Sequence, residues 1–538
     1  MILAWRKGWV FKAVVLAGAG ITASCVPARA QLLDQIGVTL LRTATNLDGT
    51  GVRVGLPEAA VGTSWQVNPA YATVRQPVER FIYYSSNGIA TNFPNDLGTE
   101  SGHADNVAGI LFGNPGGVAT NVVKVDNFDA DFFFNNYIIS NAEPVADAVV
   151  NQSFTFGNVT NVDPVPDGCI SVDDQQALDT LYDNYAVAHG TLFISAVNNS
   201  GSVSPPGTAY NSLGVGACGP GAASSIGPTV DNGRCKPDLV APQSVTSFAA
   251  PQVAGAAALL LQAAMRGDGG AATNAAADPR TIKALLMNGA IKPPDWKPAG
   301  SAPLDARYGA GVLNVFNAWR QFAGGRQPFT SAEQVAGGGN HPPAGVGGAV
   351  AVLNGWDFNT NTSHSASPAQ DGVNHYLFNA TNGMGFTLTA TLVWNRHLGK
   401  TAINNLDLFL YDCASGRLVA SSTSRVDNVE HLFVPRLAPG RYDLQVWKAG
   451  AGAVSDTETY ALAFAFTSPT LTLTPAGTNL WLTWPAYPAG FVAEASQGLT
   501  ANNWSTNSLP PVVFTNGQNT IRLNATHAVQ FFRLRQGQ

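Results

Sequence analysis

Charged side chains are scarce in this sequence. Asp, Glu, Lys and Arg make up 12% of the 538 residues, against roughly 25% in average proteins. The formal net charge is −6, and no run of Lys or Arg is present that would follow a phosphate backbone. The composition therefore predicts no nucleic-acid partner.

Signatures of several other kinds of site are missing as well. The sequence has no HEXXH zinc motif, no glycine-rich phosphate-binding loop and no CxxC pair. Only five cysteines are present, and those that follow Cys25 do not have the spacing of metal ligands. These absences exclude metalloenzyme and nucleotide-binding functions. In an oxidising compartment a disulfide between Cys218 and Cys235 is the favoured pairing, with other pairings open.

No apolar run after the first 30 residues is long enough to span a bilayer. Those first 30 residues have the pattern of a signal peptide, with positive charges, an apolar run over Ala13–Ala23 and a small-x-small cleavage site at Ala28–Ala30. We therefore expect a secreted, periplasmic or cell-envelope protein. Lipid attachment through Cys25 is the less favoured alternative, because leucine usually stands three residues before such a cysteine.

Beyond the signal peptide, patterns typical of strands and helices alternate. The expected strands are Val52–Leu56, Ala148–Phe154 and Thr191–Val197. The expected helices are His103–Phe112, Asp174–His189, Pro251–Met265 and Pro279–Ala290. This alternation predicts an α/β domain over residues 31–330, with a mostly parallel sheet covered by helices on both faces.

The pattern changes after this domain. Residues 331–348, which include the Gly/Pro-rich stretch Gly337–Gly348, are expected to form a linker. Residues 349–467 predict a β-sandwich, with strands at Phe386–Trp394, Leu406–Tyr411, His431–Val434, Tyr442–Val446 and Tyr460–Phe466. Residues 468–538 predict a small C-terminal β domain.

Acidic residues of the sandwich region allow two interpretations. They could hold a structural Ca²⁺, which needs clustered oxygen ligands, or they are solvated loop acids, which is the favoured alternative. The residues are Asp407, Asp412, Asp427 and Glu430.

Three segments of the α/β region carry candidate catalytic groups, and each also has a plainer interpretation. The segment SGHADNVAGILFG (101–113) places His103 on the first turn of a helix, where a surface histidine beside a cap is the alternative. The segment SVTSFAAPQVAGAAALLL (244–261) places Ser247 near the start of a helix. The helix dipole and the unpaired N–H groups there would stabilise an oxyanion beside Ser247. The alternative is that Ser247 only caps the helix. The segment GTLFISAVNNSG (190–201) ends a strand in Asn198, either a turn former or an oxyanion donor.

Together with KPDLVAP before the serine, these segments resemble the signature blocks of the subtilisin-like serine proteases (subtilases). The family's HGTHVAG stands here as HADNVAG, its GTSMASPHVAG as VTSFAAPQVAG and its AAGN as SAVN. The resemblance spans roughly residues 35–321 and implies a subtilisin-like fold. It implies Ser247 as nucleophile, His103 as general base and Asn198 as oxyanion amide. The only other histidine of the region, His189, stands at a helix end, where a cation faces the dipole.

A fourth stretch, AVVNQSF (148–154), resembles the strand that lines the substrate in this family. It implies that Ser153 and Phe154 lie beside the specificity pocket. A plain core strand explains the stretch equally well.

The acidic member of the triad departs from the family pattern. Where the family has VAVIDTG this chain has VGLPEAA, so Glu58 takes the place of the aspartate and Asp48 is only a fallback. In one interpretation Glu58 orients His103. In the other the acid is lost and the domain is inactive, since loss of the triad acid costs about ten-thousand-fold in rate. The retained carboxylate favours the first interpretation.

These features predict an exported serine endopeptidase that acts on protein or peptide substrates through a Glu-His-Ser triad. Its chemistry is expected to need no cofactor. The alternative is an inactive subtilase-like scaffold that serves as a binding or surface-adhesion protein through its β domains. The oligomeric state stays open.

Overall fold

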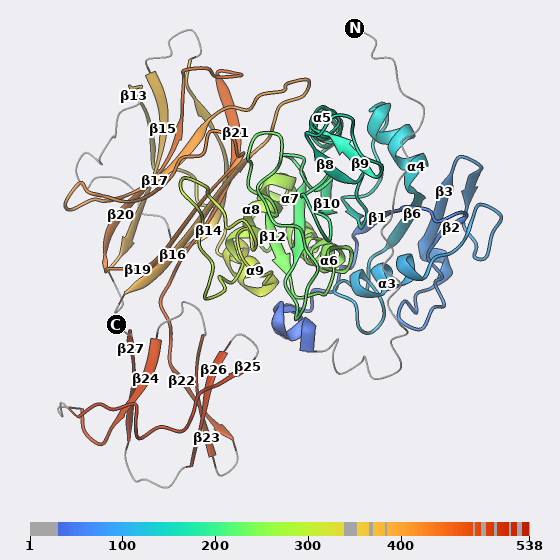
Figure 1. Ribbon diagram of the computed structural model, residues 1–538. Helices are drawn as coiled ribbons and strands as arrows, with labels where there is room; N and C mark the ends of the chain where they lie inside the picture. Colours follow the sequence, from blue (N-terminus) through green and yellow to red (C-terminus); the bar gives the residue numbers. More distant parts are fainter. Residues whose placement is uncertain are drawn as a thin grey trace.

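The computed structural model describes residues 31–337, 352–364, 370–381, 385–476, 479–485, 491–499, 503–515, 518–524 and 530–536. The predicted signal peptide, residues 1–30, and most of the predicted linker lie outside these residues. Figure 1 shows an α/β domain, a β-sandwich beside it and a small β domain next to the sandwich.

Eight strands form the sheet of the α/β domain, in the order β12-β11-β10-β7-β1-β6-β3-β4. Neighbouring strands are parallel, except that β3 and β4 form an antiparallel pair at one edge. The predicted mostly parallel sheet is therefore confirmed. The strands are β1 (Arg53–Glu58), β3 (Phe81–Ser85), β4 (Gly88–Ala90), β6 (Lys124–Asp129), β7 (Val149–Gln152), β10 (Leu192–Ala196), β11 (Leu213–Ala217) and β12 (Leu239–Ala241).

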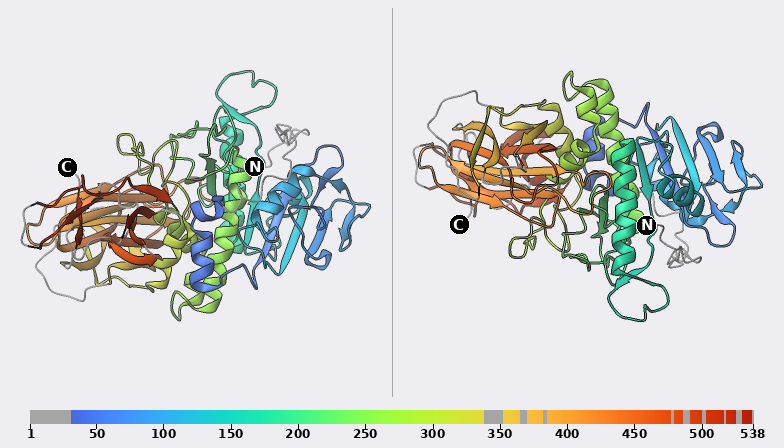
Figure 2. Two further views of the ribbon diagram at one scale, coloured as in Figure 1. Left: turned by 90° about the horizontal axis from the view of Figure 1, so that it is seen from below. Right: turned by 90° about the horizontal axis from the view of Figure 1, so that it is seen from above.

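Helices cover both faces of this sheet, as the two views of Figure 2 show. One hydrophobic core lies under α3 (Gly102–Leu111), α6 (Thr246–Arg266), α8 (Pro279–Asn288) and α9 (Val315–Ala323). A second core lies under α4 (Ala130–Phe133), the π-helix η2 (Phe134–Ile139) and α5 (Val172–His189). Val149 belongs to the first core and Val150 to the second, because successive side chains of a strand point to opposite faces.

Helix α6 begins at Thr246 rather than at Pro251, where the sequence analysis started it, so the proline lies inside the helix. The residue before the helix, Val245, makes no side-chain capping bond. Among the described helices, α6 alone is long and apolar enough to cross a membrane, but 83% of its apolar window is buried inside the protein. The helix therefore packs as the core helix of the α/β domain.

The β-sandwich packs a five-stranded sheet, β13-β15-β20-β17-β18, on a four-stranded sheet, β14-β21-β16-β19. Every neighbouring pair is antiparallel, which confirms the predicted sandwich. The strands are β13 (Ser331–Ala336), β14 (Asn354–Thr362), β15 (Gln370–Ala380), β16 (Phe386–Trp394), β17 (Leu406–Asp412), β18 (Leu418–Ser422), β19 (Val429–Leu437), β20 (Gly440–Lys448) and β21 (Thr457–Thr467).

Two expectations need correction. Residues 331–336, assigned to the linker, form edge strand β13, because Val335 packs with Val373 and Trp447 of the sandwich. Cys218 and Cys235 are not joined, and the four cysteines among the described residues are all free. The Cys235 thiol lies 3.8 Å from the carbonyl oxygen of Leu304 instead.

The small C-terminal domain has a four-stranded and a two-stranded sheet around a core that includes Leu482, Trp484 and Ile521. The predicted small β domain is therefore present. Its strands are β22 (Thr472–Ala476), β23 (Asn479–Pro485), β24 (Phe491–Ser496), β25 (Val513–Thr515), β26 (Gln518–Asn524) and β27 (Phe531–Gln536).

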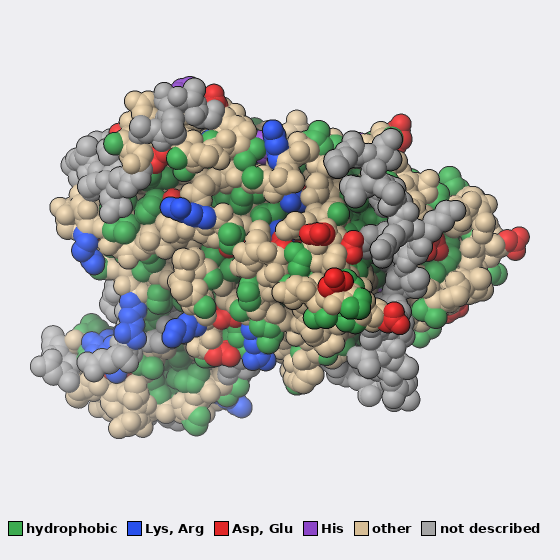
Figure 3. Space-filling model, turned by 45° about the horizontal axis from the view of Figure 1, so that its top comes forward, with side chains coloured by type: hydrophobic (Ala, Val, Ile, Leu, Met, Phe, Trp, Pro, Cys, Tyr) green, Lys and Arg blue, Asp and Glu red, His purple; other side chains and the backbone are tan. Residues whose placement is uncertain are grey.

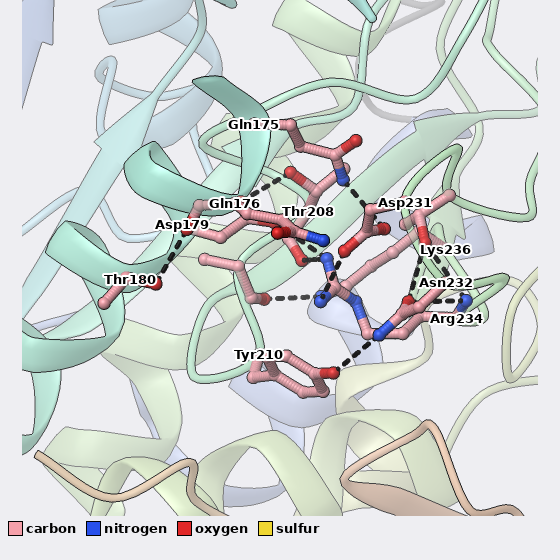
Figure 4. A network of polar contacts seen from close by, with 12 residues as sticks. Gln175, Gln176, Asp179, Thr180, Thr208, Tyr210, Asp231, Asn232, Arg234 and Lys236 are labelled. Atoms are coloured by element: carbon pink, nitrogen blue, oxygen red, sulfur yellow. Dashed lines mark hydrogen bonds and ion pairs between the residues drawn. The ribbon is translucent and has the colours of Figure 1, made fainter. Parts of the chain in front are cut away.

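The sandwich and the α/β domain share a buried interface. Arg396 of the sandwich pairs with Asp183 of α5 at 2.7 Å. The ring of Tyr210 contacts two guanidinium groups, with Arg234 at 4.1 Å and Arg396 at 4.8 Å from its centroid. Arg234 in turn pairs with Asp179 at 2.7 Å, in the network drawn in Figure 4. Charges buried in this way need partners, so the sandwich completes the polar network of the α/β domain.

The surface reflects the low charge of the sequence. On the face drawn in Figure 3, uncharged and apolar side chains cover most of the area, and the acidic and basic side chains are scattered.

Candidate active site

Three elements carry Glu58, His103 and Ser247, and they meet at the carboxyl end of the interior strand β1. Glu58 is the last residue of β1, whereas His103 and Ser247 lie in the first turns of α3 and α6. These two helices pack against each other. The carboxyl end of a parallel sheet is where the active sites of open α/β folds are found.

The carboxylate of Glu58 holds the His103 ring by a hydrogen bond from Nδ1 to Oε1. Glu58 is only 2% exposed. Burial lowers the pKa of His103, but the charge of Glu58 and the hydrogen bond to it outweigh burial, so the pKa lies above its ordinary value. A carboxylate on Nδ1 fixes the orientation of the imidazole and leaves Nε2 for a second partner.

Two local features place this ring. The hydroxyl of Ser101 caps α3 by accepting a hydrogen bond from the amide of Ala104 at 3.3 Å. Phe248, the residue after Ser247, lies over the imidazole with ring centroids 5.9 Å apart and planes 25° apart. The turn that carries Ser247 is therefore adjacent to the His103 ring.

A second carboxyl group lies on α3, two residues after the histidine. Asp105 is fully buried, and its Oδ1 accepts a hydrogen bond from the amide of Asn68 at 2.7 Å. Burial, and then the acidic neighbours Glu100 and Glu58, raise the pKa of Asp105 to about 8. The carboxylate that bonds the imidazole is therefore that of Glu58, whereas Asp105 bonds the main chain of Asn68.

The Ser247 hydroxyl has no hydrogen bond to the His103 ring among the described contacts. Hydrogen bonds of this kind often shorten and align only in the complex with substrate. The hydroxyl does not cap α6 either, since the residue before the helix is Val245. The plainer interpretation of Ser247 as a capping residue therefore finds no support in the structure.

The structure does not bring the Asn198 amide to the nucleophile. Its Nδ2 donates to Oδ1 of Asn158 at 2.9 Å. The next side chain, Asn199, reaches the start of α6, where its Oδ1 accepts hydrogen bonds from the amide and the hydroxyl of Thr246, both at 2.8 Å. Asn199, and not Asn198, is therefore the amide side chain that contacts the start of α6, and the oxyanion role stays a prediction.

A backbone angle explains this shift. Asn198 has φ = 100°, in the left-handed region that favours glycine and that asparagine tolerates better than most residues. Asn198 thus takes the place of the glycine in the family's AAGN block, and Asn199 takes the place of the asparagine. The sequence offers one signal for this residue, because Asn199 is the second of two adjacent asparagines before Ser200-Gly201.

Two donors at the start of α6 have no hydrogen-bond acceptor among the described residues. One is Nδ2 of Asn199, whose Oδ1 is engaged by Thr246. The other is the backbone N–H of Ser247, in the first turn of the helix. A pair of donors of this kind, next to a hydroxyl, is suited to binding an oxyanion.

The two residues predicted to line the substrate lie in different surroundings. The Ser153 hydroxyl donates to the carbonyl oxygen of Ser247 at 2.8 Å. Phe154 is 5% exposed and packs edge-on against Phe156, with ring centroids 6.2 Å apart, in the core under α5. Contact with substrate stays a prediction for both residues.

The remaining sequence candidates lie elsewhere. Asp48 precedes β1, at the opposite end of the strand from Glu58, and its Oδ2 accepts from Asn121 at 2.7 Å. His189 ends α5, and its Nε2 lies 3.3 Å from the carbonyl oxygen of Asn141.

The acids considered for Ca²⁺ serve as hydrogen-bond acceptors. Asp427 accepts from the amide of Cys235 at 2.7 Å, and Asp412 accepts from the amide of Ser415 at 2.8 Å. No group of three or more His, Cys, Asp or Glu side chains suited to a metal ion occurs in the part of the chain that the structure describes. A cavity of about 660 Å³ between α9 and the sandwich is not lined by Glu58, His103 or Ser247.

Part of the α/β domain matches a known protein family. Residues 71–311 match the family model described as "Subtilase family" (Peptidase_S8), and this range contains His103, Asn199 and Ser247, whereas Glu58 precedes it. The matched range covers less than half of the chain, and it makes this part of the α/β domain similar to the subtilase family. A comparison with curated proteins gave no match.

Among solved structures, the chain is similar to tripeptidyl peptidase 2, at 12% identity and a TM-score of 0.31, with 77% of this chain and 44% of that chain covered. It is also similar to the CspB protease of Clostridium perfringens, at 14% identity and a TM-score of 0.39, with 54% of this chain and 97% of that chain covered. The chain thus spans less than half the length of tripeptidyl peptidase 2.

Proposed function

We propose that this chain is an exported serine endopeptidase that hydrolyses peptide bonds in protein substrates through an acyl-enzyme on Ser247. The hydrogen bond between Glu58 and His103 is the observation that supports the proposal most, because it supplies the oriented imidazole that a general base requires. Export rests on the signal-peptide pattern of residues 1–30.

The proposed reaction uses only groups of this chain, the peptide and water. Oγ of Ser247 attacks the carbonyl carbon while Nε2 of His103 takes the hydroxyl proton, and Glu58 stabilises the imidazolium that forms. The oxyanion accepts hydrogen bonds from Nδ2 of Asn199 and the backbone N–H of Ser247. Breakdown of the tetrahedral intermediate expels the amine, which receives the proton from His103. Water then attacks the acyl-enzyme by the same steps and releases the carboxylic acid.

Digestion of casein tests this proposal. The purified full chain should release peptides from casein, and the Ser247→Ala variant should not, because it lacks the attacking oxygen. Circular dichroism of both proteins should show the same folded spectrum, so that loss of activity is not loss of structure. A folded wild-type protein that leaves casein and a mixed peptide library intact would favour the inactive binding scaffold.

A further inference from the structure

Pro251 removes the helical partner of one backbone acceptor in α6. In an α-helix the carbonyl oxygen of residue i accepts a hydrogen bond from the amide of residue i+4, so the partner of Ser247 would be residue 251. Proline has no N–H, and its ring crowds that carbonyl. Helix α6 nevertheless runs through Pro251, which is buried. The residue left without its helical bond is thus the nucleophile itself.

Ser153, the residue that follows β7, supplies the missing donor. Its hydroxyl lies 2.8 Å from the carbonyl oxygen of Ser247, a normal length for an O–H···O hydrogen bond. The Ser153 side chain is buried, at 6% exposure. The bond therefore replaces, through a side chain, the one that Pro251 cannot make.

Asn151 sets the direction of this hydroxyl. Its Nδ2 donates to Oγ of Ser153 at 3.0 Å, and Asn151 is itself buried. Because the serine oxygen accepts this bond, its own proton is available for the carbonyl of Ser247. Asn151 and Ser153 thus form a short relay that ends on the nucleophile.

The position of β7 connects this relay to the rest of the site. β7 pairs with β1 on one side and with β10 on the other. β1 ends at Glu58, and β10 leads into the turn that contains Asn199. The relay therefore ties the Ser247 turn to the strand that separates the orienting acid from the oxyanion amide.

We propose that Ser153 is a positioning residue, which with Asn151 fixes the main chain of Ser247 in place of the bond removed by Pro251. The role is distinct from substrate recognition, and it rests on the proposed function of Ser247. Misplacement of a reacting group by as little as 1 Å can cost about 100-fold in rate, so one bond at this point matters for catalysis.

Four variants test the proposal through steady-state kinetics on a chromogenic peptide. Ser153→Ala should lower kcat about tenfold, the equivalent of one net hydrogen bond, with KM changed by less than about twofold. Ser153→Thr keeps the hydroxyl and should retain activity within about threefold. Pro251→Ala alone should change kcat by less than about threefold. The double variant Ser153→Ala/Pro251→Ala regains an amide at residue 251 and should recover most of the lost kcat.

Ser195→Ala is the matched control. Ser195 is a buried serine on the adjacent strand β10, and its hydroxyl donates to Oε1 of Gln152 at 2.8 Å. The Ser195→Ala variant also loses a buried serine hydroxyl, but one that bonds Gln152 and not Ser247. Its kcat should therefore stay within about threefold of the wild-type value. A rise in KM at constant kcat in Ser153→Ala would overturn the proposal in favour of a substrate-pocket role. The proposal would also be overturned if the double variant Ser153→Ala/Pro251→Ala had the same low kcat as Ser153→Ala.

The free energy of unfolding, measured by urea denaturation, keeps this test separate from the proposed function. Ser153→Ala should destabilise the wild-type background more than the Pro251→Ala background, because the second background has its own amide for the Ser247 carbonyl. Equal effects in the two backgrounds would contradict the bond, whatever the activity. If Ser153→Ala destabilises the two backgrounds unequally but the wild-type protein cleaves no substrate, the hydrogen bond from Ser153 to Ser247 is upheld. The proposed peptidase function is then overturned instead.

Discussion

Replacing Glu58 with glutamine should lower kcat about ten-thousand-fold, the loss that follows when the carboxylate of a serine triad becomes an amide. Glutamine fills the same buried space, so the fold should be retained. An amide cannot stabilise the imidazolium, and its NH₂ group favours the wrong tautomer of the ring. Initial rates on a chromogenic peptide, at substrate concentrations above KM, measure this change directly.

The same variant should change the dependence of kcat/KM on pH. Catalysis needs the neutral imidazole, so activity falls as the pH drops through the pKa of His103, which Glu58 holds above its ordinary value. Removing the carboxylate lowers that pKa, and the acidic limb should therefore move to lower pH while the maximum falls. Glu58→Asp, which keeps the charge, serves as the control. Suppose instead that Glu58→Gln keeps more than a tenth of the wild-type kcat and that the acidic limb of its kcat/KM profile does not move. Glu58 would then not be the triad acid.

Replacing Asn199 with alanine should lower kcat by about 100- to 1000-fold, the effect of removing one oxyanion donor. KM should change little, because the bond forms mainly in the transition state. Asn199→Asp sharpens the test, since it keeps the oxygen that accepts from Thr246 but loses the donor, and it should be at least as inactive.

Asn198→Gly is the matched variant for this experiment. Glycine adopts φ = 100° without strain, so the turn should be kept while the side chain is removed. We expect a kcat within about threefold of wild type. The opposite result, a large loss at residue 198 and a small one at residue 199, would restore the original sequence prediction and refute the assignment made from the structure.

Much of the fold could be predicted from the sequence, because the type of each long element is set by local periodicity. The strand expected at Thr191–Val197 is β10 at Leu192–Ala196, and the helix expected at Asp174–His189 is α5 at Val172–His189. The start of α6 was placed wrongly, because proline usually stands in a first helical turn. In α6 the proline lies inside the helix, and the hydroxyl of Ser153, just after β7, bonds the carbonyl oxygen of Ser247.

The candidate site could be predicted in part, for a related reason. Short blocks of sequence make His103 and Ser247 candidates, since each lies in a pattern of fixed spacing, and the structure brings their two helices together. The choice between Asn198 and Asn199 depends on the φ angle of Asn198, which cannot be read directly from the sequence. The pairing of Arg396 with Asp183 joins two domains and has no local signal at all.

In the proposed mechanism Glu58 and His103 together make the hydroxyl of Ser247 nucleophilic. Reaction with a fluorophosphonate, followed by peptide mass spectrometry, tests it most directly, because only an activated serine is phosphonylated. We expect one modified residue, Ser247, in the wild-type protein and none in the His103→Ala variant. A folded wild-type protein that stays unmodified, or that carries the label on a different serine, would contradict it.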